Sequence, residues 1–393
     1  MNKGTGVAIR DFSNGQAFNL DGPWAGIWQA LRRPLPAAIF SSPKAGAAGD
    51  LATRNEQAKR LLDAGLLLSL GARNELAVTP GLLANLRSVS AADLKRYVTN
   101  TAFCRRHGNA RFSEFIRNPE GQDAGIDLTL PSDGVILYHS YLPGMVHLGA
   151  QDATAFSAAV ASGGAISLPE TKWTKAWVEN AQLDFESLVH KSGYLFIAIQ
   201  NTRELNAFLR FIATRALSTV VEIGTARGGT FYCLSQLASD DALLVSMDLM
   251  GMVNGGGQSP EERPVFESFR KRGQTLRFIE GNSHEPATKD ALTSTLGGRK
   301  VDLLFIDGDH SYAGVKSDFE MYRDLVKPGG LVVFHDICLF QDEWGDVGVG
   351  DFWREARDGF QHHEFIDPQG SSKRQKTPGE IPAWGIGVLE MPS

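Results

Sequence analysis

The sequence has few cysteines and no long uninterrupted apolar segment. Its three cysteines, Cys104, Cys233 and Cys338, lie far apart, which argues against a disulfide framework and against a paired metal-ligand motif. We expect no membrane-spanning helix, because no run of about 18 uncharged apolar residues occurs. The first residues also lack the apolar core of a secretion signal. Together these absences predict a cytoplasmic protein with reduced thiols.

The sequence also lacks an excess of positive charge. Lysine and arginine number 39 against 45 aspartates and glutamates, which gives a formal net charge of −6. Nucleic-acid binding requires clustered basic side chains that contact phosphates, so we do not expect nucleic acid as the partner. The absence of long apolar runs makes a membrane equally unexpected. The chain does have 393 residues, of which 42% are apolar, and this is enough for two domains.

From about residue 215 onward, short apolar runs alternate with stretches that are compatible with helices. Each run has the length of a strand and resembles a parallel strand that helices cover on both faces. This alternation predicts an α/β fold, with a Rossmann-like, doubly wound and mostly parallel sheet. The predicted strands are 219–223, 242–248, 276–280, 301–306, 330–334 and 385–389, and the predicted helices are 231–238, 260–272, 286–296 and 313–326.

Residues 1–185 lack this alternation. We expect an accessory, mainly helical amino-terminal domain there, followed by the α/β domain over residues 186–393. Between residues 55 and 90, a helix, a hairpin and a second helix fit a winged-helix-like unit. An irregular helical domain is the alternative.

The strongest local motif follows the first predicted strand of the α/β domain. Residues 222–229 read Glu-Ile-Gly-Thr-Ala-Arg-Gly-Gly, so that an acidic residue precedes a glycine-rich turn and a helix. Gly224 and Gly228 allow the backbone to approach a ligand, and the amino terminus of the helix offers free N–H groups. Glu222 suits a ligand with an ammonium group, such as the methionyl part of S-adenosylmethionine. A glycine-rich turn without a ligand is the alternative.

The ends of the next two predicted strands suit a nucleoside. Asp248 ends the second strand, where a carboxylate can accept hydrogen bonds from both ribose hydroxyls. Asn282 and Ser283 follow the third strand and are placed to contact the edge of adenine. For Asp248, capping of a helix or loop is the alternative.

The fourth and fifth predicted strands end in carboxylates and imidazoles. Asp307, Asp309 and His310 follow one of them, and His335 and Asp336 follow the other. Buried carboxylates are costly without a cation, so Asp307, His335 and Asp336 are candidate ligands of a divalent ion. His310 is best suited to take a hydroxyl proton near neutral pH. Helix capping by Asp309 and a loop hydrogen bond from His335 are the alternatives.

These motifs resemble those of class I S-adenosylmethionine-dependent methyltransferases, over about half of the chain. More narrowly, they resemble the group that contains cephalosporin-hydroxylase-type and macrolide-sugar O-methyltransferases. The matching stretches are residues 222–229, 247–248, 281–284, 305–312 and 327–336.

The resemblance implies S-adenosyl-L-methionine as the cofactor and a role for each matching residue. His310 falls on the basic histidine of the family, and Asp307, His335 and Asp336 fall where members that use Mg²⁺ bind it. His335 and Asn282 depart from the pattern, because the family has Glu at the first position and commonly Asp at the second. The implied cofactor-binding residues are Glu222, Gly224, Thr225, Gly228, Asp248, Asn282, Ser283 and Asp307.

The resemblance predicts an O-methyltransferase that acts on a hydroxyl of a small molecule, such as a glycosylated or polyketide-type natural product. His310 would remove the hydroxyl proton, while an ion held by Asp307 and Asp336 orients the hydroxyl. Residues 1–185 would bind the acceptor or form a homo-oligomer. Two alternatives stay open: an NAD(P)-dependent oxidoreductase on the same fold, and a non-catalytic ligand-sensing regulator. Ala226, which replaces the second glycine of the dinucleotide motif, argues against the oxidoreductase.

Overall fold

The chain divides into two compact units. One consists of Met1–Leu94 and Leu130–Leu188, and the other of Lys95–Thr129 and Val189–Ser393. The domain boundary that the sequence predicts after residue 185 stays a prediction. The residues that this computed structural model describes are 7–10, 17–20, 75–77, 86–99, 133–139, 146–162, 165–167, 185–194, 196, 198–249, 262–271, 273–373 and 383–393.

The described part of the first unit contains short antiparallel strands. They are β1 (Val7–Arg10) with β2 (Ala17–Leu20), β3 (Glu75–Ala77) with β7 (Ala165–Ser167), and the sheet of β4 (Leu86–Ser90), β5 (Val135–His139) and β6 (Val146–Leu148). The helix α7 (Ala150–Ser162) lies in this unit, and α5 (Ala91–Thr99) continues from it into the second unit. Most of the winged-helix-like unit expected near residues 55–90 lies outside the described residues, so that expectation stays a prediction.

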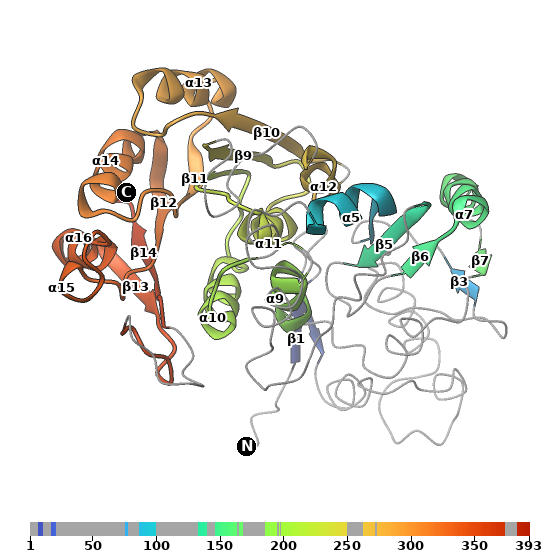
Figure 1. Ribbon diagram of the computed structural model, residues 1–393, viewed down its shortest axis with the longest axis horizontal. Helices are drawn as coiled ribbons and strands as arrows, with labels where there is room; N and C mark the ends of the chain where they lie inside the picture. The colour runs from blue at the N-terminus through green and yellow to red at the C-terminus, as the bar shows by residue number, and fades with distance from the viewer. Residues whose placement is uncertain are drawn as a thin grey trace. The chain divides into compact units, whose positions relative to one another are not determined.

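The second unit is built on a seven-stranded sheet with the order β10-β9-β8-β11-β12-β14-β13. The first five of these strands are parallel; β14 then pairs antiparallel with β12, and β13 pairs antiparallel with β14 at the edge of the sheet. Figure 1 shows the sheet. The predicted doubly wound α/β fold is thus confirmed. The strands are β8 (Thr219–Ile223), β9 (Leu243–Asp248), β10 (Thr275–Glu280), β11 (Val301–Ile306), β12 (Val326–His335), β13 (Gln361–Phe365) and β14 (Ile386–Glu390).

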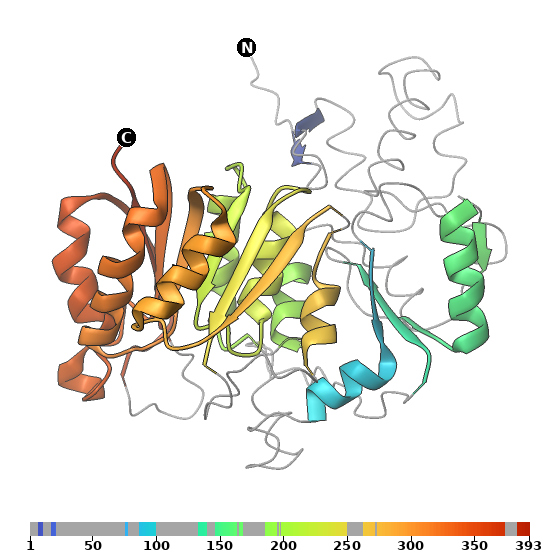
Figure 2. The ribbon, with the colours of Figure 1, turned by 90° about the horizontal axis from the view of Figure 1, so that it is seen from above.

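Helices cover both faces of this sheet. The helices α10 and α11 lie on one face, and α13, α14 and α16 lie on the other (Figure 2). Among the described helices, none has the length and apolar character needed to cross a bilayer. The helices are α9 (Phe185–Tyr194), α10 (Thr202–Ile212), α11 (Gly229–Leu237), α12 (Arg263–Ser268), α13 (Pro286–Leu296), α14 (Tyr312–Tyr322), α15 (Gln341–Trp344) and α16 (Val349–Ala356), with the 3₁₀ turns η1 (Arg323–Leu325) and η2 (Arg357–Gly359).

The apolar runs of the sequence form the centre of this sheet. Strand β8 is buried along its whole length, and β11 is equally buried beside it. The chain leaves β8 toward α11 on one face and leaves β11 toward α14 on the other face. In open α/β sheets this reversal opens a crevice at the carboxyl ends of the two strands. The fold therefore places the polar residues that follow β8 and β11 side by side.

Candidate active site

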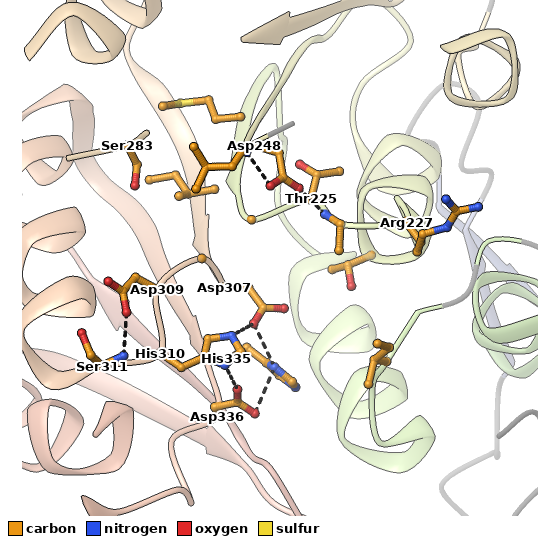
Figure 3. Close-up of a pocket in the computed structure, with 18 of the residues that line it drawn as sticks. Thr225, Arg227, Asp248, Ser283, Asp307, Asp309, His310, Ser311, His335 and Asp336 are labelled. Atoms are coloured by element: carbon orange, nitrogen blue, oxygen red, sulfur yellow. Dashed lines mark hydrogen bonds and ion pairs between the residues drawn. The ribbon is translucent and has the colours of Figure 1, made fainter. Parts of the chain in front are cut away.

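A pocket of about 830 Å³ lies at the carboxyl edge of the sheet in the second unit. Its walls come from the segments that follow β8, β9, β10, β11 and β12, together with residues 198–200. Figure 3 shows the polar side chains that line it. Of the residues predicted from the sequence, the pocket is lined by Gly224, Thr225, Asp248, Asn282, Ser283, Asp307, His310, His335 and Asp336.

The glycine loop consists of residues 224–228, of which residues 224–227 line one end of the pocket. Gly224 has φ 82°, and a Cβ there would lie 2.0 Å from the carbonyl oxygen of Asp307, so only glycine fits between β8 and β11. Ala226 has φ 46°, which is unusual for a residue with a side chain. Gly228, with φ 83°, is the N-cap of α11. The predicted glycine-rich turn thus brings backbone close to the pocket.

Glu222 lies beneath this loop and does not line the pocket. Its side chain is buried, and its Oε2 atom has no hydrogen-bond partner among the described residues. Burial, reinforced by the charge of Asp307, raises the pKa of Glu222 well above its usual range. Thr225 is also buried, and its hydroxyl oxygen accepts a hydrogen bond of 2.7 Å from Ser246. The hydrogen bond from Ser246 therefore ties the loop to β9.

Asp248 links the end of β9 to the glycine loop. Its Oδ2 accepts a hydrogen bond of 2.5 Å from the Ala226 N–H, and its Oδ1 accepts one of 2.7 Å from the Leu249 N–H. Burial raises the pKa of Asp248 to about 6. The carboxylate is therefore ionised at neutral pH, fixed in direction, and in contact with the pocket.

The segment after β10 forms the adjoining wall. The Asn282 Oδ1 accepts the His284 N–H at 3.0 Å, and the Ser283 carbonyl oxygen accepts the Tyr322 hydroxyl at 2.6 Å. The His284 Nε2 lies 3.4 Å from the buried carboxylate of Asp318. Asn282 and Ser283 thus border the pocket, in a turn that contacts α14, and their contact with adenine stays a prediction.

The other end of the pocket is a cluster of two aspartates and two histidines, hereafter the acid–histidine cluster. It consists of Asp307, His310, His335 and Asp336 (Figure 3). The two ring nitrogens of His310 lie 3.3 Å from Asp307 and 3.4 Å from Asp336. The His335 Nδ1 lies 3.2 Å from Asp307 and 3.3 Å from Asp336. Each imidazole therefore lies between the same two carboxylates.

The charges in this cluster support one another. Burial alone would lower the pKa of His310, but its hydrogen bond to Asp307 and the charge of Asp336 outweigh burial and raise the pKa to about 9. The same two carboxylates raise the pKa of buried His335 to about 9. In return, the histidines outweigh burial at Asp307 and lower its pKa to about 2. At neutral pH, His310 is therefore an imidazolium and not yet a base.

The cluster also offers ligands for a metal ion. Among the described residues, Asp307, His310 and Asp336 each present one ligand atom, and these atoms lie within 4.8 Å of one another. The sequence points to His335 as the third ligand, whereas this grouping contains His310. Two carboxylate oxygens and an imidazole fit a divalent cation, and they suit a transition-metal ion at least as well as Mg²⁺.

Several lining residues carry no signal in the sequence. The Gln200 Nε2 donates a hydrogen bond of 3.3 Å to Asp307, and the Gln200 Oε1 is buried without a partner among the described residues. Trp384 packs edge-on against His335, with the ring centres 5.9 Å apart. Gln200 precedes α10 and Trp384 precedes β14, so neither belongs to a strand-end motif. The tertiary fold alone brings them to the pocket.

Comparisons with known proteins agree with this geometry. Residues 221–337 match the family model of a methyltransferase domain. An uncharacterised protein, R132, of Acanthamoeba polyphaga mimivirus is 33% identical over 30% of this chain, and the match covers 51% of that protein. The chain thus matches about half the length of that relative. Ribosomal RNA large subunit methyltransferase E of a Psychrobacter species is 27% identical over 52% of this chain and 91% of its own length.

Solved structures match over a similar share of the chain. A putative caffeoyl-CoA O-methyltransferase from Staphylococcus aureus aligns with 49% of this chain and 85% of its own, at 20% identity and a TM-score of 0.35. The family match favours methyl transfer over the oxidoreductase and regulator alternatives. Residues 221–337, which include most of the residues that line the pocket, thus match a methyltransferase domain, and they lie within the doubly wound, seven-stranded sheet of the second unit.

Proposed function

We propose that this protein transfers a methyl group from S-adenosylmethionine to a hydroxyl of a small molecule. The observation that carries this proposal is that one pocket runs from the glycine loop to the acid–histidine cluster. Its volume of about 830 Å³ lies within the usual range of small-molecule and cofactor sites. The match to a methyltransferase domain supports the type of reaction.

The polar groups at the glycine-loop end fit the parts of this cofactor. Each oxygen of Asp248 accepts one backbone N–H and keeps a lone pair for a ribose hydroxyl. The buried Oε1 of Gln200, which has no partner among the described residues, can accept a hydrogen bond from an ammonium group. When bound, the cofactor supplies an electrophilic methyl group on a sulfonium.

His310 is the group that we propose to take the proton of the acceptor hydroxyl. Its side chain is 39% exposed, whereas His335 is 4% exposed, so His310 is the accessible imidazole of the cluster. Its pKa is about 9 because of Asp307 and Asp336. The negative charges of these two carboxylates must therefore be neutralised before His310 can act as a base near neutral pH. A cation on the two carboxylates would do so, because it would cancel the charges that hold the proton.

We propose that Asp307 and Asp336 hold such a divalent cation, with Mg²⁺ as the first ion to test. The ion would supply positive charge that lowers the pKa of an adjacent hydroxyl. Dialysis against a chelator should then reduce activity, and Mg²⁺ or Mn²⁺ should restore it. If activity is indifferent to the chelator, these aspartates serve only to position the histidines.

The wall of the pocket beside the acid–histidine cluster is consistent with a small-molecule acceptor. Leu339, Val347 and Trp384 line the pocket near the cluster and offer apolar surface, while Asp346 offers a carboxylate. The relative named as a ribosomal RNA methyltransferase makes ribosomal RNA the second candidate acceptor. The net charge of −6 disfavours that candidate. A role of residues 1–185 in acceptor binding or homo-oligomer formation, and a cytoplasmic location, remain predictions.

The direct test is transfer of a labelled methyl group from S-adenosylmethionine into a panel of glycosides, phenols and ribosomal RNA. We expect label in one or more of the small hydroxylated molecules and none in RNA. His310→Ala should abolish this transfer, whereas His362→Ala, at an exposed histidine on edge strand β13, is the matched control and should retain turnover. If no member of the panel is labelled and S-adenosylmethionine does not bind, the proposal is overturned.

A further inference from the structure

The glycine loop contains a buried cation that the mechanism above does not use. Arg227 lies between Ala226 and Gly228, and its side chain is only 3% exposed. Figure 3 shows this side chain pointing away from Asp307 and His310. Burial of a guanidinium costs free energy unless charged and hydrogen-bonding partners compensate it, so we expect such partners around Arg227.

Three kinds of contact hold Arg227 in place within the second unit. Its Nη2 donates a hydrogen bond of 2.6 Å to the carbonyl oxygen of Tyr97, and its Nη1 forms an ion pair with Glu262. The guanidinium also lies 4.1 Å from the centre of the Tyr97 ring, a cation–π contact. The Tyr97 hydroxyl in turn donates to the Arg227 carbonyl oxygen. We call Tyr97, Arg227 and Glu262 the Arg227 clamp.

The Arg227 clamp fixes the part of the loop that faces the pocket. Ala226, one residue before Arg227, adopts φ 46°, and its N–H donates to the Asp248 carboxylate. A left-handed backbone costs free energy in any residue with a Cβ, so surrounding contacts must maintain it. On the other side of Arg227, a Cβ at Gly228 would lie 2.5 Å from the ring of Phe266 in α12. The loop is therefore held by Asp248 at the pocket and by the Arg227 clamp on the side that points away from the acid–histidine cluster.

We propose that Tyr97 and Arg227 are positioning residues that set the affinity for S-adenosylmethionine. This inference rests on the proposed function. Because the Arg227 clamp keeps the Ala226 N–H directed at Asp248, it keeps the carboxylate aligned for the ribose. Loosening the clamp weakens cofactor binding and leaves the proton-transfer step at His310 unchanged, because no contact joins the clamp to the acid–histidine cluster among the described residues.

The test is calorimetric binding of S-adenosylmethionine, combined with separate measurement of KM and kcat. Tyr97→Phe removes the hydroxyl and keeps the ring, and we expect Kd and KM for the cofactor to rise about tenfold, the effect of about one lost hydrogen bond. At saturating cofactor, kcat should stay within about twofold. The double variant Arg227→Met, Glu262→Gln removes both charges, so that no unpaired charge stays buried, and should weaken binding at least as much.

Arg215 provides the matched control. Its guanidinium pairs with Glu390 and lies 4.8 Å from the ring of Phe211, so that it makes the same two kinds of contact at a more exposed position that does not line the pocket. Arg215→Met should therefore change thermal stability and leave the cofactor Kd unchanged. If Tyr97→Phe does not fold, the double variant decides the question.

The outcomes separate this inference from the proposed function. A wild-type protein that does not bind S-adenosylmethionine overturns both. A wild-type protein that binds it, with variants of the Arg227 clamp that bind equally well, overturns only the positioning role. A loss of kcat at unchanged KM would also contradict that role, because it would place the effect on the transfer step.

Discussion

The two ends of the pocket are built in different ways. At the glycine-loop end, backbone hydrogen bonds fix the geometry, and Asp248 is oriented by two of them. At the other end, four ionisable side chains orient one another through charge, with each imidazole between the same two carboxylates. The difference predicts that the proposed cofactor binding and the proposed proton transfer can be disrupted separately, by different substitutions and at different pH.

The largest expected effect is at His310. We expect His310→Ala to lower kcat by about 10²–10⁴-fold, the usual contribution of a general base. The cofactor Kd should stay unchanged, because among the described residues no hydrogen bond or ion pair joins His310 to the glycine loop. Labelled-methyl transfer and calorimetry measure the two quantities. Turnover equal to that of the wild type would show that His310 is not the base.

The pH dependence should differ between the two ends. Without added metal, His310 becomes neutral only as pH rises through about 9, so kcat/KM for the acceptor should rise by roughly fiftyfold between pH 7 and pH 9. Asp248 loses its charge as pH falls through about 6, so the cofactor Kd should rise below that pH. A divalent cation should shift the first transition to lower pH and leave the second in place. A single transition shared by both quantities would contradict the separation.

The raised pKa of His335 also predicts a change in stability. The native state holds this proton more tightly than the unfolded chain does, so the stabilisation is fully present below pH 6.5 and is lost as pH rises through about 9. Thermal unfolding of the metal-free protein should therefore occur at lower temperature at pH 9 than at pH 6.5. His335→Gln should remove much of this difference.

A substitution at Asp248 should affect only the glycine-loop end. Asp248→Ala removes the acceptor of the Ala226 N–H and the proposed ribose ligand, and we expect the cofactor Kd to rise by about 10–100-fold. At saturating cofactor, kcat should be nearly unchanged. If kcat falls instead while the Kd is preserved, the assignment of the two ends is wrong.

Gln200 connects the two ends, so its substitution should have the smallest and most mixed effect. Its amide donates to Asp307, and its Oε1 is the acceptor that we assign to the ammonium group of the cofactor. Gln200→Leu should raise the cofactor Kd and lower kcat by a few-fold each, or about 0.5–1.5 kcal/mol for a lost hydrogen bond. An effect confined to one of the two parameters would assign Gln200 to that end alone.

The sequence predicts the central sheet well because its signals are local. The apolar run that forms β8, the glycines after it and Asp248 can be read from neighbouring residues, and the structure places them as expected. Strand β13 has no such signal, because Gln361–Phe365 is a polar edge strand that pairs only with the last strand.

Contacts between distant segments could not be predicted in the same way. The sequence indicates histidines and aspartates at one edge, but not that His310 lies between Asp307 and Asp336, which sets its pKa. Gln200 and Tyr97 come from segments without a motif, and folding alone brings them to the pocket and to Arg227. The placement of these side chains depends on side-chain orientation and on packing between distant segments, and neither can be predicted from a local sequence pattern.

The central claim is that the glycine loop and Asp248 bind the methyl donor. Calorimetric titration of S-adenosylmethionine into the wild-type protein, Asp248→Ala and His310→Ala tests it most directly. The account predicts one binding site in the wild type, equal affinity in His310→Ala, and affinity weakened by about 10–100-fold in Asp248→Ala. Absence of binding to the wild type, or equal binding by all three proteins, would contradict it.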